Sequence, residues 1–190
     1  MERFTTLTGT AAAMFQPNID TDALLPSRYL TQSTETGKSG FGPRLFADWR
    51  YEKDGAPKLD FALNKPEFAN AVILITGDNF GCGSSRENAV WALVGFGIRC
   101  VIAPGFGEIF FNNCFENGLL PIVLDTETVE GLATQLEMGA HGRTVTVDLR
   151  GRTITAPDGT QIAFTVDDAR RAALLDGLDA VRITLQRESE

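Results

Sequence analysis

Three short apolar runs organise the middle of the chain: AVILIT at residues 71–76, IRCVIA at 98–103 and LLPIVL at 119–124. Each has the length and composition of a strand that is buried on both faces of a sheet. Between them, RENAVWALVGF (86–96) and GEIFFNNCFENG (107–118) place apolar residues at helical spacing, and the second helix is expected to close at its final glycine. Strand, helix, strand, helix and strand in this order predict parallel βαβ units.

Weaker patterns precede this region. Residues 3–15 have modest β character, and the polar stretch QPNIDTDALLPSRYL (16–30), with its two prolines, is typical of a loop. The Ser/Thr/Gly-rich stretch TQSTETGKSGFG (31–42) predicts a mobile segment. Two short helices are expected at 43–51 and 65–71, separated by a KDGAPK turn.

The last third of the chain predicts an addition to the parallel core. TETVEGLATQLEMG (126–139) is an acidic helix pattern, and residues 143–166 predict strands joined by a PDGT turn. Residues 167–186 predict a final amphipathic helix whose apolar stripe is formed by Leu174, Leu175, Leu178 and Val181. We therefore expect one α/β domain over residues 1–190, with a core of about 1–125 and residues 126–190 packed on it.

Composition limits the classes of function. The formal net charge of −8 argues against a nucleic-acid partner, which would require a basic face. The start of the chain, MERFTTLTGTAAAMF, is too polar for an export signal or a membrane span, so we expect a reducing, cytoplasmic location and no membrane partner. The three cysteines have no metal-binding spacing, and with a single histidine, His141, a Ser-His-Asp or zinc site is difficult to assemble.

The stretch GDNFGCGSSRENAVWAL (77–93) links the first apolar run to a helix and is the strongest candidate for a functional site. In α/β proteins ligands bind where parallel strands end, and a helix N-terminus favours an anion there. Gly77, Gly81 and Gly83 permit close approach or positive φ. A structural alternative is a capping box in which Ser84 caps the helix and Glu87 reaches back.

The polar residues of this stretch predict more than a cap. Its sequence is not a Walker A motif and lacks the third glycine of a dinucleotide fingerprint. Arg86 offers a planar fork that can hold a carboxylate bidentately, and Ser85 adds a second hydroxyl. Next to that charge at a helix start, Ser84 is a candidate base that requires no histidine.

The stretch 77–93 resembles the GxNFGCGSSRE signature of the small subunits of 3-isopropylmalate dehydratase, which are similar to the swivelling domain of aconitase. NIDTDALLPSRYL (18–30), FGEIFFNNCFENGLLPI (106–122) and GLDAVRITLQRE (177–188) agree with the same family. The resemblance covers nearly the whole chain. It implies an aconitase-like swivelling fold with a parallel βαβ core, added antiparallel strands and a C-terminal helix.

The resemblance also implies an activity, a partner and a cofactor. The family belongs to a heteromeric hydro-lyase that isomerises 2-isopropylmalate to 3-isopropylmalate by dehydration and rehydration via isopropylmaleate, in leucine biosynthesis. The hydroxy-diacid loses its hydroxyl at a [4Fe–4S] cluster carried by the large iron–sulfur subunit, and we expect no cluster or metal on this chain. The small subunit is then inactive without its partner.

Roles follow for individual residues. By resemblance, Ser84 is the base, Ser85 and Arg86 hold a substrate carboxylate, and Thr21 and Asp22 belong to a polar loop that faces the same site. The alternative for Asp22 and its neighbour Asp20 is an Asx turn. By the same resemblance, Arg28 and Tyr29 lie where the family selects the substrate side chain; their alternative is a solvated loop.

Two departures leave the substrate open. Asn88 and Val90 stand where the family commonly has His and Pro. The alternatives are a paralogous small subunit acting on citraconate, dimethylmaleate or homoaconitate, and a non-catalytic carboxylate-binding module. Cys82 is expected to be a small packed residue, because a redox role would require a depressed thiol pKa.

Overall fold

A seven-stranded mixed sheet, in the order β4-β3-β2-β1-β5-β6-β7, forms the centre of the molecule in the computed structural model, which describes residues 1–31 and 37–178. The parallel part consists of β1 (Thr6–Met14), β2 (Ile73–Thr76), β3 (Cys100–Ala103) and β4 (Leu120–Val123). The antiparallel part consists of β5 (Thr144–Asp148), β6 (Thr153–Thr155) and β7 (Gln161–Ala163). Both parts were predicted, and the predicted α/β class is confirmed.

The long strand β1 joins the two parts. Its first half, Thr6 to Thr10, pairs antiparallel with β5, and its second half, Ala11 to Met14, pairs parallel with β2. Side chains alternate between two cores, so that in β2 Ile73 and Ile75 face one core while Leu74 faces the other. This burial on both faces explains why the central strands are continuous apolar runs.

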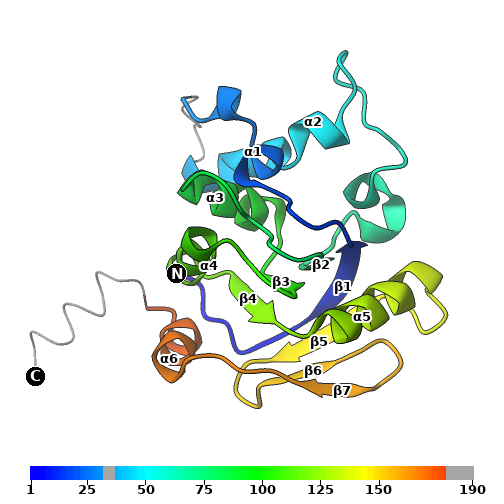
Figure 1. The fold of residues 1–190 in the computed structure, drawn as a ribbon, viewed down its shortest axis with the longest axis vertical. Helices are drawn as coiled ribbons and strands as arrows, with labels where there is room; N and C mark the ends of the chain where they lie inside the picture. Colours follow the sequence, from blue (N-terminus) through cyan, green and yellow to red (C-terminus); the bar gives the residue numbers. More distant parts are fainter. Residues whose placement is uncertain (32–36, 179–190) are drawn as a thin grey trace, which may run out of the picture.

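Helices cover both faces of the sheet (Figure 1). On one face lie α1 (Thr21–Leu24), α2 (Ala47–Arg50) and α3 (Glu87–Phe96), with α5 (Thr126–Met138) on the other. The remaining helices are α4 (Glu108–Glu116) and α6 (Asp168–Asp176). Short 3₁₀ segments are η1 (Ser27–Tyr29), η2 (Gly37–Arg44), η3 (Ala62–Asn64) and η4 (Pro66–Phe68).

Four of the predicted elements differ from the structure. The final helix ends at Asp176, because Gly177 takes a left-handed φ of 69° and its N–H donates the closing hydrogen bonds to the Ala173 and Leu174 carbonyls. Residues 179–190, including Val181 of the predicted stripe, lie outside the described residues. The helix predicted at 65–71 is only the single turn η4, and that at 43–51 is the short α2. Residues 37–42, predicted within a mobile segment, instead belong to η2, which packs on α3; residues 32–36 are not described.

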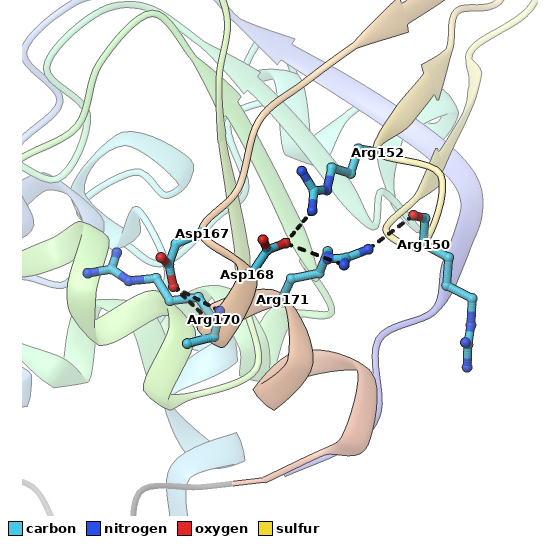
Figure 2. A network of polar contacts seen from close by, with 7 residues as sticks. Arg150, Arg152, Asp167, Asp168, Arg170 and Arg171 are labelled. Atoms are coloured by element: carbon cyan, nitrogen blue, oxygen red, sulfur yellow. Dashed lines mark hydrogen bonds and ion pairs between the residues drawn. The ribbon is translucent and has the colours of Figure 1, made fainter.

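An ion pair and a side-chain hydrogen bond, from Arg171 to the Arg150 carbonyl, hold α6 to the antiparallel part of the sheet (Figure 2). The Asp168 carboxylate pairs with Arg152, next to β6, and with Arg171 one turn along the helix. On its other side the helix meets the N-terminal segment, where the Phe4 N–H donates to the Leu174 carbonyl at 2.9 Å. The first and last described segments therefore lie side by side.

Candidate functional site

Three loops meet where the parallel strands β1, β2 and β3 end. They are residues 15–20, 77–83 and 104–107, and backbone hydrogen bonds of 2.7–3.0 Å join them to one another and to α1. In each bond a backbone N–H donates to a backbone carbonyl: Gly81 to Ile19, Thr21 to Cys82, Asn18 to Asp78, Phe80 to Gly105 and Gly107 to Phe80. The 77–83 loop is the middle of the three and is held from both sides.

Glycines allow this close arrangement. Gly81 has φ +72°, and a Cβ atom there would lie 2.2 Å from the Phe110 ring. Gly77 lies against the chain leaving β1, where a Cβ atom would come within 2.6 Å of the Gln16 backbone. Gly83 has φ +93° and turns the chain towards α3. Each of the three positions therefore needs the absence of a side chain, as the sequence predicted.

The loop delivers two exposed hydroxyls and one guanidinium to the start of α3. Ser84 and Ser85 are exposed, while the side chain of Arg86 is only 18% exposed. Arg86 forms an ion pair with Asp22 of α1, and the Thr21 hydroxyl donates to the Ser84 carbonyl at 2.9 Å. The structure therefore brings Thr21, Asp22, Ser84 and Arg86 together, although more than sixty residues of chain separate the two segments.

The capping-box interpretation of this loop is wrong. The helix begins at Glu87, and its N-cap is Arg86, which makes no side-chain capping bond. Ser84 lies two residues before that cap, so its hydroxyl is not used to satisfy the helix. Glu87 does not reach back; its carboxylate accepts a hydrogen bond from the Asn117 amide at 2.9 Å. Asn117 carries no sequence signal beyond its place in the stretch 106–122.

In place of the predicted Asx turn, one of the two aspartates is a helix cap. Asp20 is the N-cap of α1, and its carboxylate accepts from the Ala23 N–H at 2.7 Å. Asp22 instead turns its carboxylate to Arg86. Thr21, between them, is only 1% exposed, so its hydroxyl supports the Ser84 backbone from inside.

Arg28 takes other partners. Its guanidinium pairs with Asp48 at 2.5 Å and lies 4.6 Å from the centre of the Tyr29 ring. The hydrogen bond from Arg28 lowers the pKa of Asp48. Arg28 and Asp48 both line a cleft of about 770 Å³, and Tyr51 and Lys58 are among its other lining residues. The contacts of Arg28 thus belong to this cleft and not to the Ser84–Arg86 loop.

The two departures from the family pattern lie on α3. Val90 is fully buried in the core on the α3 side of the sheet, so it affects packing and not the surface of the loop. Asn88, the second residue of α3, is half-buried. Neither departure replaces one of the exposed residues of the loop, Ser84 and Ser85.

The environment of the cysteines does not suit an iron–sulfur cluster. Cys100 and Cys114 are fully buried, and burial raises the pKa of both thiols. Burial and the charge of Asp20 raise the pKa of Cys82 above its ordinary 9.0, which disfavours a reactive thiolate. Within residues 1–31 and 37–178, no three His, Cys, Asp or Glu side chains converge as metal ligands. Cluster ligation requires such converging thiolates, so the residues present do not fit the group.

Comparisons with known proteins find one family along most of the chain. A family model described as "Aconitase C-terminal domain" matches residues 1–127, and one described as "LeuD_N" matches residues 136–168. The 3-isopropylmalate dehydratase small subunit of Allorhizobium ampelinum is 51% identical over 189 residues, covering 100% of this chain and 92% of the relative. That of Paramagnetospirillum magneticum is 52% identical over 190 residues, with the same coverage.

A solved structure extends the likeness to three dimensions. The 3-isopropylmalate dehydratase (leuD) of Methanocaldococcus jannaschii matches with a TM-score of 0.68 and 25% identity, over 96% of this chain and 95% of that one. In the part of the chain that the structure describes, no helix has the length and apolar character needed to cross a membrane.

Proposed function

Because the chain belongs to the family of 3-isopropylmalate dehydratase small subunits, with an aconitase C-terminal domain, we propose how its site serves that enzyme. The family provides the small subunit of the hydro-lyase that isomerises isopropylmalate in leucine biosynthesis. We propose that Ser84, Ser85 and Arg86 form this chain's share of the active site. The observation that carries the proposal is the anchored loop, which presents two hydroxyls and a guanidinium at the carboxyl edge of the parallel strands.

Arg86 is the residue that binds a substrate carboxylate. Its side chain is mostly covered, which strengthens its electrostatic interactions, and its planar fork matches a carboxylate. Asp22 is itself a carboxylate and would repel a diacid, so its role is to orient Arg86 through their ion pair. Ser85, exposed beside Arg86, donates a further hydrogen bond to the same substrate group.

Ser84 moves the proton. In dehydration it takes the proton from the carbon next to the one that bears the hydroxyl. The C–H electrons form the alkene as the C–O bond breaks, and the oxygen leaves as hydroxide, which becomes water by taking a proton from the solvent or from the partner chain. In rehydration Ser84 returns the proton to the alkene. The cation of Arg86 two residues away favours the ionised hydroxyl that this role requires, and the site needs no histidine.

The rest of the active site comes from a partner chain. The buried cysteines of this chain do not fit a cluster, and the name of the relatives, small subunit, implies a large one. We place the [4Fe–4S] cluster on that large subunit, with the hydroxy-diacid bound between the two chains. Three free cysteines fit a reducing compartment, so we place the complex in the cytoplasm.

The first experiment is an activity assay on this chain mixed anaerobically with its reconstituted large subunit. Loss of alkene absorbance is followed with isopropylmaleate, citraconate and dimethylmaleate in parallel, and each subunit alone is the control. We expect turnover of isopropylmaleate, and only with both chains present. Preference for a smaller diacid would reassign the substrate, and no turnover from a complex whose cluster is verified would contradict a catalytic role.

A further inference from the structure

Asn117, at the end of α4, is the centre of a polar cluster that touches the start of α3. Its Oδ1 accepts from the Trp91 indole N–H at 3.0 Å and from the Lys38 ammonium at 2.9 Å. Its Nδ2 donates to the Glu87 carboxylate and to the Asn113 carbonyl, both at 2.9 Å. Two donors face the oxygen and two acceptors face the nitrogen, so the amide has one possible orientation and is fully paired.

This cluster meets the site loop at one residue. Glu87 is the first residue of α3 and follows Arg86 directly in the chain. A second tie comes from η2, because Lys38 lies 3.7 Å from the Glu87 carboxylate and 4.8 Å from the centre of the Trp91 ring. The amide of Asn117 therefore joins three elements, η2, α3 and α4, at the point where the loop becomes a helix.

Asp22 and Thr21 hold the loop from the other side. Since the N-cap residue Arg86 makes no side-chain cap, the start of α3 depends on contacts such as that of Glu87 for its position. We propose that Asn117 is a positioning residue for the reaction: by fixing Glu87 it sets the place of Arg86 and Ser84. The proposal rests on the function proposed above for these two residues.

The same helix contains a matched control. Asn112, on α4, also accepts a hydrogen bond from a charged side chain, Arg170 of α6, at 2.7 Å. It ties α4 to α6 and not to the start of α3. Asn112→Leu therefore removes a comparable bond to a cation, whereas Asn117→Leu removes the tie to the loop.

The sharpest test reverses one hydrogen bond. In Asn117→Asp the oxygen that replaces Nδ2 faces the Glu87 carboxylate, and the two repel. In the double variant Asn117→Asp/Glu87→Gln the glutamine amide donates back to the aspartate, and the net charge is that of the wild type. Glu87→Gln alone gives the baseline. Each variant is assayed with the large subunit for kcat and KM, and its thermal unfolding is followed in parallel.

We expect Asn117→Asp to raise KM for isopropylmaleate about tenfold, the size of effect that loss of a hydrogen bond to a charged group produces. The double variant should recover most of this loss relative to Glu87→Gln. Asn112→Leu should lower the unfolding temperature without raising KM. A double variant no better than Asn117→Asp, or a rise in KM with Asn112→Leu as large as with Asn117→Leu, would overturn the proposal.

A second measurement separates this inference from the proposed function. Hydrogen–deuterium exchange of the peptide covering residues 84–93 is compared between the isolated wild-type chain and its variants. Asn117→Asp should speed exchange in this peptide, and Asn112→Leu should not. Unchanged exchange would contradict the positioning role even if the enzyme is active, whereas faster exchange in an enzyme that rejects isopropylmaleate would contradict only the proposed function.

Discussion

Ser84 is held by its backbone, and its side chain is left available. The buried Thr21 hydroxyl donates to the Ser84 carbonyl, while the Ser84 side chain is exposed and lies outside the helix cap. Arg86, two residues on, is fixed through its side chain by Asp22. The residues that position the loop are thus distinct from the hydroxyl to which we assign the proton transfer. A substitution of Ser84 can therefore change the reaction without changing the stability of the loop.

Replacing Ser84 by alanine should abolish turnover without unfolding the chain. Loss of a general base lowers kcat by about 10²–10⁴-fold. The free energy of unfolding should change by no more than about 0.5 kcal/mol, because an exposed side chain outside a cap is removed. Steady-state kinetics of the two-subunit complex and urea unfolding of the chain measure the two effects. Near-normal turnover would show that Ser84 is not the base.

At the scale of elements, α3 is the support of the site. Its N-terminus carries the loop, and η2 lies along it at backbone contact distance. A Cβ atom at Gly42 of η2 would lie 2.3 Å from the Gly95 backbone, and one at Gly95 would lie 2.7 Å from the Ser39 carbonyl oxygen. Two glycines on facing elements allow this contact, so any larger residue must push η2 away from α3.

Gly95→Ala should therefore destabilise the protein although it favours a helix. In an open helix position alanine gains about 0.8–1.0 kcal/mol over glycine. Gly131 of α5 offers the matched control, because nothing lies within 4 Å of a Cβ atom there. Urea unfolding should show a loss of stability for Gly95→Ala and a gain for Gly131→Ala. A gain at both positions would mean that η2 is not packed on α3 as described.

At the scale of the whole molecule, two thiols are sealed in the cores on opposite faces of the sheet. Cys100 belongs to the core on the α5 side and Cys114 to the core on the α3 side, and burial raises the pKa of both. Thiols of the unfolded chain ionise near their ordinary 9.0, whereas those of the native state stay protonated. The native state then binds more protons, so its stability is present below pH 9.0 and decreases as pH rises above it.

We expect the free energy of unfolding to fall by up to about 1.4 kcal/mol per pH unit for each buried thiol above this point. The measurement is urea unfolding between about pH 8 and pH 10, under reducing conditions. A Cys100→Ala/Cys114→Ala variant is the control, since lysines and tyrosines titrate equally in both proteins. If the two slopes coincide, the buried thiols do not contribute to the pH dependence.

The fold was predictable to the extent that its signals are local. The apolar runs at 71–76, 98–103 and 119–124 became β2, β3 and β4, each two residues shorter than its run, because burial on both faces imposes an apolar sequence. The final helix was predicted too long, since the left-handed glycine at position 177 stops it and an apolar stripe alone does not reveal that. The 3₁₀ segment η2 was missed because its support, Gly95, is distant in sequence.

In the candidate site, too, some residues carry a local sequence signal whereas others are brought in from distant segments. Ser84, Ser85 and Arg86 are adjacent, so one stretch of sequence carried the whole signal. Their supports are remote: Asp22 lies 64 residues from Arg86, and Asn117 lies 30 residues from Glu87. For Arg28 the sequence predicts a place near the substrate side chain, which stays a prediction; the structure adds its ion pair with Asp48, and both residues line one cleft.

Local sequence patterns were enough to establish the class of fold, the family and the loop that carries the exposed hydroxyls, because burial patterns and turn glycines act over a few residues. The folded chain was needed to show that Ser84 precedes the helix cap, that Asp22 pairs with Arg86 and that Asn117 donates a hydrogen bond to Glu87. The Asp22 contact depends on the loops that meet at the carboxyl edge of the parallel strands, and the Asn117 contact depends on the packing of α3 against α4. The physical reason is that such pairings are set by packing between distant segments, which no local pattern encodes.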